Sequence, residues 1–354
     1  MSRSRFSRRL LRWYDRHGRP DLPWRLAGNP YHTWVSEIML QQTQVNTVIP
    51  YFHRFTKRFP DIIALARADL DSVLHLWTGL GYYARARNLH RAAKIMVEKY
   101  DGQLPQDFQT LQALPGIGRS TAAAIAALAF DQRQVILDGN VKRVLTRYHA
   151  LDGWPGKRAV ENQLWSLADA HTPNKRLADY TQAIMDLGAT VCRRVRPYCE
   201  RCPVRKSCKA FAQGNPQDYP SPAPRRSLPV KAVTMVMIRD QRGRVLLQQR
   251  PPAGVWGGLW TFPECNDDDV PAWCRYTLGL SVRLDDRWQP LRHSFTHFHL
   301  DITPIDAHVL GASGQAMENP DVIWYNPDKP DERGLPVPVK HLLGKLRETY
   351  EPNR

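Results

Sequence analysis

Residues 114–121 read Leu-Pro-Gly-Ile-Gly-Arg-Ser-Thr and connect two segments in which apolar residues recur every three or four positions. Gly116 and Gly118 carry no Cβ, so they let the backbone turn tightly and approach a ligand closely. The amides of such a turn, and those at the start of the following helix, point outward and can bind phosphate oxygens. The stretch therefore predicts a phosphate-binding hairpin between two helices, although a plain helix–turn–helix connection has the same pattern.

The region around this hairpin has helical periodicity throughout residues 1–212. Prolines and glycines interrupt the apolar pattern at short intervals, as they do between helices. Segments with apolar residues at helical spacing cover residues 69–77, 85–100, 108–114, 121–130, 141–150 and 160–170. We therefore predict an N-terminal all-α domain of about ten helices over residues 1–212.

The pattern changes after a proline-rich stretch. Residues 213–231 include five prolines and show no apolar periodicity, so we predict a linker over residues 213–229. Beyond it, β-rich runs occupy residues 231–238 and 244–249, residues 293–300 alternate as a strand does, and residues 339–350 have helical spacing. This predicts an α+β domain over residues 230–354, and hence a chain of two domains.

Positive charge is concentrated in the predicted helical domain. Residues 1–212 contain 33 Lys and Arg against 17 Asp and Glu, whereas residues 213–354 contain 17 of each group. A domain this basic indicates a polyanionic partner, of which nucleic acid is the commonest. A solvated basic surface without such a partner would have the same composition.

The composition and the N-terminal sequence exclude several classes of protein. Residues 120–130 form the longest charge-free stretch of the alanine-rich part. This is about half the length of a membrane-spanning helix, so a transmembrane protein is excluded. No apolar segment of a secretory signal follows Arg8 and Arg9, so we expect a cytoplasmic protein. The arginine and serine content of the first residues leaves a transit peptide as an alternative.

Four of the six cysteines lie within 17 residues, at Cys192, Cys199, Cys202 and Cys208. In a chain without a secretory signal, such a cluster indicates metal binding rather than disulfides. The Cys-x6-Cys-x2-Cys-x5-Cys spacing suits the four irons of a cubane cluster, and a tetrahedral zinc ion is the alternative. The Lys and Arg residues of the same loop can compensate the charge of thiolates or contact phosphates.

Asp138 ends the apolar run of residues 135–137 and precedes a helical segment, 20 residues after Gly118. This position places its carboxylate at a helix N-terminus, where aspartate serves as a cap worth about 1 kcal/mol. A capped carboxylate is also held ionised, so the structural and the catalytic interpretations are compatible.

The glycine hairpin, Asp138 and the four-cysteine loop occur in the order found in one family. With them, residues 1–212 resemble the helix-hairpin-helix DNA glycosylases with an iron–sulfur loop, which include endonuclease III. The resemblance implies one [4Fe-4S] cluster on the four cysteines. It also implies that a monomer binds double-stranded DNA through hairpin residues such as Gly116, Gly118 and Ser120, and so associates with the nucleoid.

Three features resemble the adenine-specific branch of this family. Residues 34–43 look like the segment that carries the catalytic acid, with Glu37 at that position. Ser120 replaces the lysine of lyase-competent relatives, which implies a monofunctional glycosylase, unless Lys142 supplies an amine for weak lyase activity. The C-terminal domain looks like a Nudix fold, which in this branch recognises 8-oxoguanine. The resemblance thus implies excision of adenine paired with 8-oxoguanine or guanine, in base excision repair.

The two acidic residues would share the chemistry. Adenine is a poor leaving group as an anion, so its release at neutral pH calls for protonation of the base. Glu37 is the candidate general acid, with a pKa raised by the apolar residues around it. Asp138 would stabilise the oxocarbenium character at C1′, either electrostatically or as a transient nucleophile, as carboxylates do in O-glycosidases.

The resemblance also assigns residues that contact the DNA. The adenosine must leave the duplex to react. Tyr82 would intercalate into the duplex, and Gln42 would contact the mispair. Trp24, Arg25 and Gln182 would line the adenine pocket.

In the C-terminal domain, Phe295, Thr296 and His297 resemble the Phe-Ser-His loop with which the family recognises 8-oxoguanine. Threonine keeps the hydroxyl of the serine and adds a methyl group. A zinc site made by the histidines at positions 293, 297 and 299 is the alternative.

The C-terminal domain departs from the Nudix pattern where metal would bind. Residues 257–264 resemble the opening of a Nudix box, but residues 265–271 lack the Arg-Glu-x2-Glu-Glu helix that holds Mg²⁺. This predicts a domain that reads a nucleotide without hydrolysing it, with active hydrolysis as the alternative. Asp267–Asp269 have the pattern of an acidic loop before a proline, or of a metal site.

Two other functions are compatible with the sequence. One is an endonuclease III-like glycosylase for oxidised pyrimidines, which would release those lesions and nick the strand. The other is a catalytically silent DNA-binding module whose cluster senses redox state.

Overall fold

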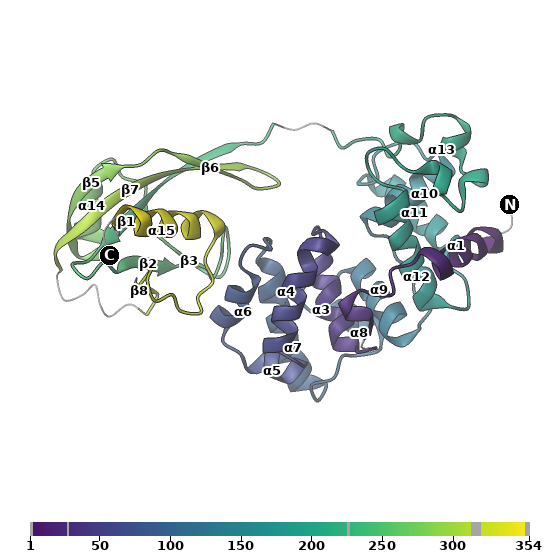
Figure 1. Cartoon of the computed structure of the whole chain (residues 1–354), viewed down its shortest axis with the longest axis horizontal. Helices are drawn as coiled ribbons and strands as arrows, with labels where there is room; N and C mark the ends of the chain where they lie inside the picture. The colour runs from purple at the N-terminus through teal and green to yellow at the C-terminus, as the bar shows by residue number, and fades with distance from the viewer. Residues whose placement is uncertain (1–2, 27, 225–226, 313–319, 351–354) are drawn as a thin grey trace. The chain divides into compact units, whose positions relative to one another are not determined.

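The computed structural model describes residues 3–26, 28–224, 227–312 and 320–350. They form two compact units, one of Met1–Arg67 and Asn88–Arg225, the other of Ala68–Arg87 and Arg226–Arg354. The first unit is helical and the second contains a sheet (Figure 1), so the predicted fold class is confirmed. The second unit also includes a short segment of the predicted helical region, and the domain boundaries at residues 212 and 230 stay a prediction.

The helices of the first unit are mostly short, as the spacing of glycines and prolines predicts. They are α1 (Arg3–His17), α2 (Pro23–Leu26), α3 (Pro30–Leu40), α4 (Val45–Arg58), α5 (Ile62–Arg67), α8 (Phe108–Ala113), α9 (Arg119–Phe130), α10 (Gly139–His149), α11 (Arg158–His171), α12 (Leu177–Asp186) and α13 (Lys209–Ala212). Helix α7 (Ala84–Lys99) begins in the second unit and continues into the first. A π-helical turn, η1 (Leu187–Val191), continues α12, and 3₁₀ turns occur at Cys199–Arg201, Arg205–Ser207 and Pro216–Asp218. Within the described ranges, no helix is long and apolar enough to cross a membrane.

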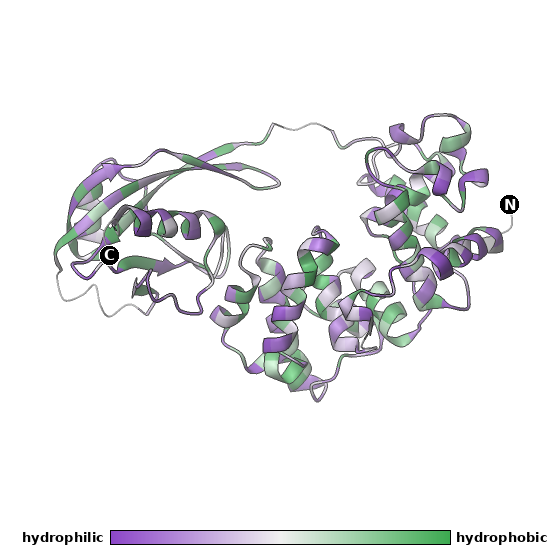
Figure 2. Cartoon of the chain, in the orientation of Figure 1, coloured by the Kyte–Doolittle hydropathy of each residue, from purple (hydrophilic) through white to green (hydrophobic). Residues whose placement is uncertain are grey.

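A hydrophobic core of the first unit lies where α1, α9, α10, α11 and α12 meet. Leu10, Leu145 and Leu164 are among the side chains buried there. Figure 2 shows hydrophobic and hydrophilic residues on different faces of the helices, as amphipathic packing requires. Beside this core, His149 and His171 lie with their Nε2 atoms 2.9 Å apart. The core fixes α10, which Asp138 precedes, and α12, which carries Gln182.

The described strands of the second unit form one mixed sheet of eight strands. They are β1 (Val230–Arg239), β2 (Val245–Gln249), β3 (Trp260–Thr261), β4 (Glu264–Cys265), β5 (Leu280–Arg287), β6 (Leu291–Ser294), β7 (His299–Ala312) and β8 (Val322–Tyr325). The main order is β3-β2-β1-β7-β5, in which β1 and β7 are parallel; β4 pairs with β1, β6 with β7 and β8 with β2. Residues 235–239 of β1 are all buried, as expected of a central strand covered on both faces. The unit also contains α6 (Leu70–Trp77), α14 (Val270–Leu278) and α15 (Val337–Tyr350).

Residues 293–300 form a hairpin instead of the single strand that their alternation predicts. β6 ends at Ser294, β7 begins at His299, and the backbone N–H of Phe295 donates to the carbonyl of Phe298 (2.9 Å). The rings of Phe295 and Phe298 stack with their centroids 4.5 Å apart, which stabilises the turn. Apolar alternation continues through this tight turn, so the pattern alone does not separate one strand from two.

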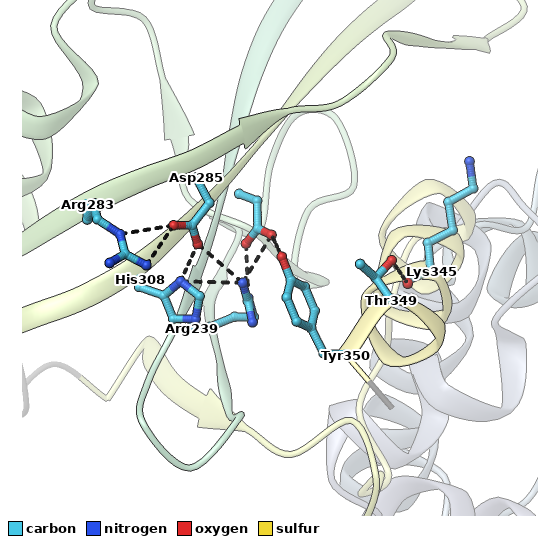
Figure 3. A network of polar contacts seen from close by, with 8 residues as sticks. Arg239, Arg283, Asp285, His308, Lys345, Thr349 and Tyr350 are labelled. Carbon is cyan, nitrogen blue, oxygen red and sulfur yellow. Dashed lines mark hydrogen bonds and ion pairs between the residues drawn. The ribbon is translucent and has the colours of Figure 1, made fainter. Parts of the chain in front are cut away.

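The last turn of α15 is attached to the sheet by a polar network (Figure 3). Arg239 of β1 pairs with the fully buried Asp306 of β7, with Nε and Oδ1 3.0 Å apart. The hydroxyl of Tyr350 donates to the same carboxylate, and the ring of Tyr350 lies 3.4 Å from the guanidinium carbon of Arg239. Asp285 of β5 accepts a further bond from Arg239 (3.4 Å). Charges that would be costly alone are therefore paired beneath α15.

Candidate active site

Glu37 lies in α3, in which the side chains of Trp34 and Ile38 are buried. Protein atoms surround its carboxyl group, although the residue keeps some accessible surface. This burial, with a contribution from the charge of Asp138, raises the pKa of Glu37 to about 8. The carboxyl group therefore holds a proton at neutral pH, as a general acid must.

Asp138 caps α10, as its position in the sequence predicts. Its Oδ1 accepts the backbone N–H of Val141 (2.7 Å), and its Oδ2 accepts Nδ2 of Asn140 (3.2 Å). Burial raises the pKa of Asp138, while these bonds and the nearby Arg143 favour the ionised form. The charge of Asp138 also contributes to the raised pKa of Glu37, so the two carboxyl groups interact electrostatically.

Asn140 and Arg143 hold Asp138 in place, and the sequence motifs did not single them out. Oδ1 of Asn140 accepts Nη2 of Arg143 (2.7 Å), and Nε of Arg143 donates to the carbonyl of Cys192 (2.7 Å). Nη2 of Arg143 also donates to the carbonyl of Gly188 (2.7 Å). Consecutive hydrogen bonds thus connect Asp138 to the first cysteine of the loop. The one signal in the sequence is that both side chains fall in the first turns of the helix that Asp138 caps.

Ser120 and Lys142 both have polar partners near Asp138. The hydroxyl of Ser120 accepts the backbone N–H of Leu137 (3.0 Å), so the first turn of α9 fixes the residue that precedes Asp138. Nζ of Lys142 pairs with Glu161 (2.7 Å).

The two glycines of the hairpin have different surroundings. Gly116 has a φ of +79°, and a Cβ there would lie 2.8 Å from the Cβ of Asn88, so this position requires glycine. Gly118 has an ordinary φ of −81° and open space where a Cβ would lie. Nε2 of Gln41 donates to the carbonyl of Gly116 (3.3 Å) and so joins α3 to the turn. The positive φ and the contact with Asn88 explain why residue 116 is glycine. No neighbour among the described residues explains Gly118, which leaves open space in front of α9.

The predicted pocket residues Arg25 and Gln182 meet in a polar cluster. Nε2 of Gln182 donates to Oδ1 of Asp186 (2.9 Å), and Nη2 of Arg19 pairs with the same oxygen (2.6 Å). Arg25 donates to the carbonyl of Arg19, and Trp24 beside it is buried. No motif indicated Arg19 or Asp186, because an ion pair between distant residues leaves no local pattern.

Gln42 and Tyr82 both have left-handed backbone conformations, with φ of 59° and 50°. Non-glycine residues rarely adopt this conformation, and it is enriched at functional loops. Tyr82 is 43% exposed, and the guanidinium carbon of Arg85 lies 5.3 Å from the centre of its ring. Gln42 belongs to the first unit and Tyr82 to the second.

The four clustered cysteines line one cavity of about 30 Å³, together with Arg147. Nη1 of Arg147 donates to Sγ of Cys192 (3.4 Å), and Sγ of Cys208 donates to the carbonyl of Arg147 (3.4 Å). Burial raises the pKa of Cys202 to about 12 and also raises the pKa values of Cys199 and Cys208. A bound metal cluster would supply the positive charge that thiolates need here. Four cysteines that line one cavity fit an iron–sulfur cluster, in which each sulfur binds a different iron, better than a single metal ion.

In the part of the chain that the structure describes, no three His, Cys, Asp or Glu side chains are arranged around a single metal-ion position. At the acidic loop, Asp269 caps α14 by accepting the backbone N–H of Ala272 (3.0 Å). Glu264, in the segment that resembles a Nudix box, pairs with Arg250 (2.5 Å).

Phe295, Thr296 and His297 occupy the tip of the β6–β7 hairpin. Thr296 and His297 are exposed, and Phe295 is held by its stacking on Phe298. The ring of Trp256 also packs against Phe295, with centroids 5.7 Å apart. The tip thus presents a hydroxyl and an imidazole, and packed aromatic side chains support it.

Family models match both parts of the chain. The HhH-GPD superfamily of base excision DNA repair proteins matches residues 35–170, and the NUDIX domain matches residues 234–345. A thermostable thymine-DNA glycosylase has a similar fold, with a TM-score of 0.54 and 27% identity, covering 60% of this chain and 97% of that one. A non-covalent endonuclease III–DNA complex gives a TM-score of 0.51 at 19% identity, covering 60% and 98%, which shows the fold alone. Fold and site thus define a helix-hairpin-helix repair glycosylase with an added NUDIX domain.

Curated relatives specify the branch. An adenine DNA glycosylase of Buchnera aphidicola subsp. Acyrthosiphon pisum is 37% identical over 349 residues, covering 98% of this chain and 99% of its own. The adenine DNA glycosylase of Rattus norvegicus is 41% identical over 311 residues, covering 73% and 60%. The chain therefore belongs to the adenine DNA glycosylases, enzymes of base excision repair. This membership favours adenine excision over the oxidised-pyrimidine and silent-module alternatives.

Proposed function

We propose that this enzyme excises adenine paired with 8-oxoguanine or guanine, with Glu37 and Asp138 as its catalytic pair. The observation that carries the proposal is that two neighbouring carboxyl groups have different surroundings. Glu37 keeps its proton near neutral pH, whereas hydrogen bonds and Arg143 counteract the effect of burial on Asp138. Burial raises the pKa of both groups, but only Asp138 has hydrogen bonds and a nearby arginine that favour its ionised form. In O-glycosidases, one carboxyl group of such a pair stays protonated and the other ionised.

Glu37 donates its proton to a ring nitrogen of adenine as the N-glycosidic bond breaks. A protonated base leaves as a neutral molecule, so the barrier falls relative to loss of an anion. The remaining accessible surface of Glu37 is where the base would approach it.

Asp138 faces the positive charge that develops at C1′. The capping bonds from Val141 and Asn140 hold its carboxylate in one orientation, which makes its stabilisation preorganised. Water then completes the hydrolysis, after electrostatic stabilisation alone or after a transient bond between Asp138 and C1′.

The product is an abasic site without strand cleavage. A lyase needs an amine to form a Schiff base, and position 120 carries a hydroxyl instead. Nζ of Lys142, the nearest amine in the sequence, is paired with Glu161. These observations support a monofunctional glycosylase.

The DNA contacts follow from the hairpin and the loops. The open space at Gly118, in front of the α9 N-terminus, suits a backbone phosphate of the DNA. Tyr82 fills the gap left by the flipped adenosine, and Gln42 contacts the mispair. Trp24, Arg25 and Gln182 line the pocket that receives the adenine.

Cys192, Cys199, Cys202 and Cys208 hold one [4Fe-4S] cluster, as their shared cavity supports. The cluster would order the basic loop, and no step of the hydrolysis passes through it. We infer further that Thr296 and His297, exposed on the β6–β7 tip, recognise 8-oxoguanine, and that the NUDIX domain does not hydrolyse nucleotides. The enzyme would act as a monomer on nucleoid DNA in the cytoplasm.

Substitution Glu37→Gln tests the catalytic assignment, with Glu98→Gln at an exposed site as the matched control. We expect single-turnover release of adenine opposite 8-oxoguanine to fall by about 10³-fold in the first variant, with tight binding to the duplex retained. The control variant keeps the activity of the parent enzyme. Persistent base release by the Glu37 variant would show that Glu37 is misassigned, and release of oxidised pyrimidines with nicking would favour the other glycosylase specificity.

A further inference from the structure

Asp186, the last residue of α12, is fully buried and has well-defined partners. Arg19 binds it three times, through Nε (3.0 Å) and Nη2 (2.6 Å) to Oδ1 and through the backbone N–H (3.1 Å) to Oδ2. The remaining bond comes from Nε2 of Gln182, one turn earlier in α12 (2.9 Å). An arginine does not lose its proton in a protein, so Arg19 keeps a permanent positive charge beside the carboxylate.

This arrangement fixes the orientation of the Gln182 amide. A carboxylate paired with arginine can only accept hydrogen bonds, so the NH₂ end of the amide must face Asp186. The carbonyl oxygen then points to the opposite side. Among the described residues, no donor bonds to that oxygen, and it is not among the buried polar atoms left without a partner. It is an accessible acceptor of fixed direction.

We propose that Asp186, held by Arg19, is a positioning residue that makes Gln182 accept a hydrogen bond from the 6-amino group of adenine. The inference rests on the proposed function, in which Gln182 lines the adenine pocket. Adenine presents a donor at C6, whereas hypoxanthine presents a carbonyl oxygen there. A fixed acceptor therefore favours adenine and disfavours hypoxanthine, because two facing oxygens leave both unpaired.

Substitution Asp186→Leu removes the acceptor that fixes the amide. The side chain of Arg19 and Nε2 of Gln182 donate to the same oxygen of Asp186, so an asparagine that kept its oxygen there would leave Gln182 unchanged. Leucine has a similar volume and no hydrogen-bonding group. The Gln182 amide can then turn its NH₂ toward the base, so the pocket no longer presents an acceptor of fixed direction.

The experiment measures single-turnover excision of adenine, hypoxanthine and purine, which has no group at C6, each placed opposite 8-oxoguanine. In Asp186→Leu we expect the ratio of the adenine to the hypoxanthine rate constant to fall by about tenfold. Purine reports damage that is independent of the C6 contact. An unchanged ratio, or an equal loss for all three bases, would overturn the inference, because a merely structural residue produces that result.

Asp179→Leu is the matched control, since Asp179 lies on the same helix and pairs with an arginine at the surface (Arg176, 2.7 Å). It should leave the ratio unchanged. If Asp186→Leu does not fold because Arg19 stays charged, Arg19→Gln combined with Asp186→Leu removes both charges. This double variant releases the Gln182 amide and should also lower the ratio of the adenine to the hypoxanthine rate constant. An unchanged ratio in the double variant counts against the inference. A parent enzyme that fails to release adenine would instead overturn the proposed function.

Discussion

Burial raises the pKa of Glu37 to about 8, so this carboxyl group is protonated at neutral pH and ionises in mild alkali. If Glu37 protonates the leaving base, the single-turnover rate constant for adenine release stays level from about pH 6.5 to 7.5. Above about pH 8 it falls roughly tenfold per pH unit. Rapid-quench measurements across this range test the expectation, and a rate constant that stays level to about pH 9.5 contradicts it.

The same burial makes Glu37 costly for stability. Because its pKa is raised from 4.5 in the unfolded chain, its contribution to stability is complete below pH 4.5 and is lost as the pH rises toward 8. Glu37→Gln removes this dependence, and we expect it to increase the free energy of unfolding at pH 7 by on the order of 3 kcal/mol. Urea unfolding at pH 4.5 and pH 7 measures the effect. If Glu37→Gln is no more stable than the parent at pH 7, burial does not destabilise the ionised carboxyl group of Glu37.

Single residues were predictable where they belong to a local motif. Glu37 and Asp138 stand in recognisable segments, and the charge of Asp138 contributes to the raised pKa of Glu37. Arg143 and Asp186 act through partners that are near in space and far or unpatterned in the sequence. Buried polar partners do not recur at a regular spacing in the sequence, so only the three-dimensional structure reveals them.

Among the structural elements, the α8–α9 hairpin separates the two functions of glycine. Gly116→Ala places a Cβ against Asn88 at a positive φ, and we expect it to lower the free energy of unfolding by about 1–3 kcal/mol. Gly118→Ala meets no neighbour and has an ordinary φ, so its stability should match that of the parent. Its DNA affinity should fall, because the methyl group occupies the space in front of α9. Thermal unfolding and duplex binding of the two variants give the comparison, and an unimpaired affinity in Gly118→Ala would place the phosphate elsewhere.

Helices were easier to predict than strands and irregular turns. The apolar spacing over residues 121–130 and 160–170 corresponds to α9 and α11, whose buried faces keep that period. The alternation over residues 293–300 hid a turn, because aromatic stacking stabilises it where glycine or asparagine usually would. The π-helical turn η1 has no sequence signature, since it depends on how α12 meets the cysteine loop.

At the scale of the whole molecule, the excess of positive charge in residues 1–212 predicts strong salt dependence. Each phosphate neutralised by Lys or Arg contributes a slope of about −0.9 to a plot of log affinity against log salt concentration. We expect the slope for full-length enzyme on duplex DNA to be steep, corresponding to several phosphates. Fluorescence anisotropy in a salt series measures it, and a flat response would contradict a basic DNA-binding face.

The two-part architecture was largely visible in composition, because the charge, the proline content and the apolar period all change near residue 213. The assignment of residues 68–87 to the second unit was not visible. It depends on contacts such as that of Asp71 in α6, which accepts Nε1 of Trp260 (3.0 Å). Such pairings join segments about 190 positions apart, and no window along the sequence contains both partners.

The neighbouring imidazoles of His149 and His171 set an acid limit on the enzyme. With their Nε2 atoms 2.9 Å apart, one ring must donate and the other accept, so the two cannot both be cationic. Burial lowers the pKa of His149, and the unfolded chain therefore takes up protons more readily below about pH 6.5. The stability that this pair confers is present above that pH and is lost as the solution becomes more acidic. We therefore expect two histidines in the packing of the helices to limit the enzyme on the acidic side. If Glu37 is the general acid, loss of its proton limits the enzyme on the alkaline side.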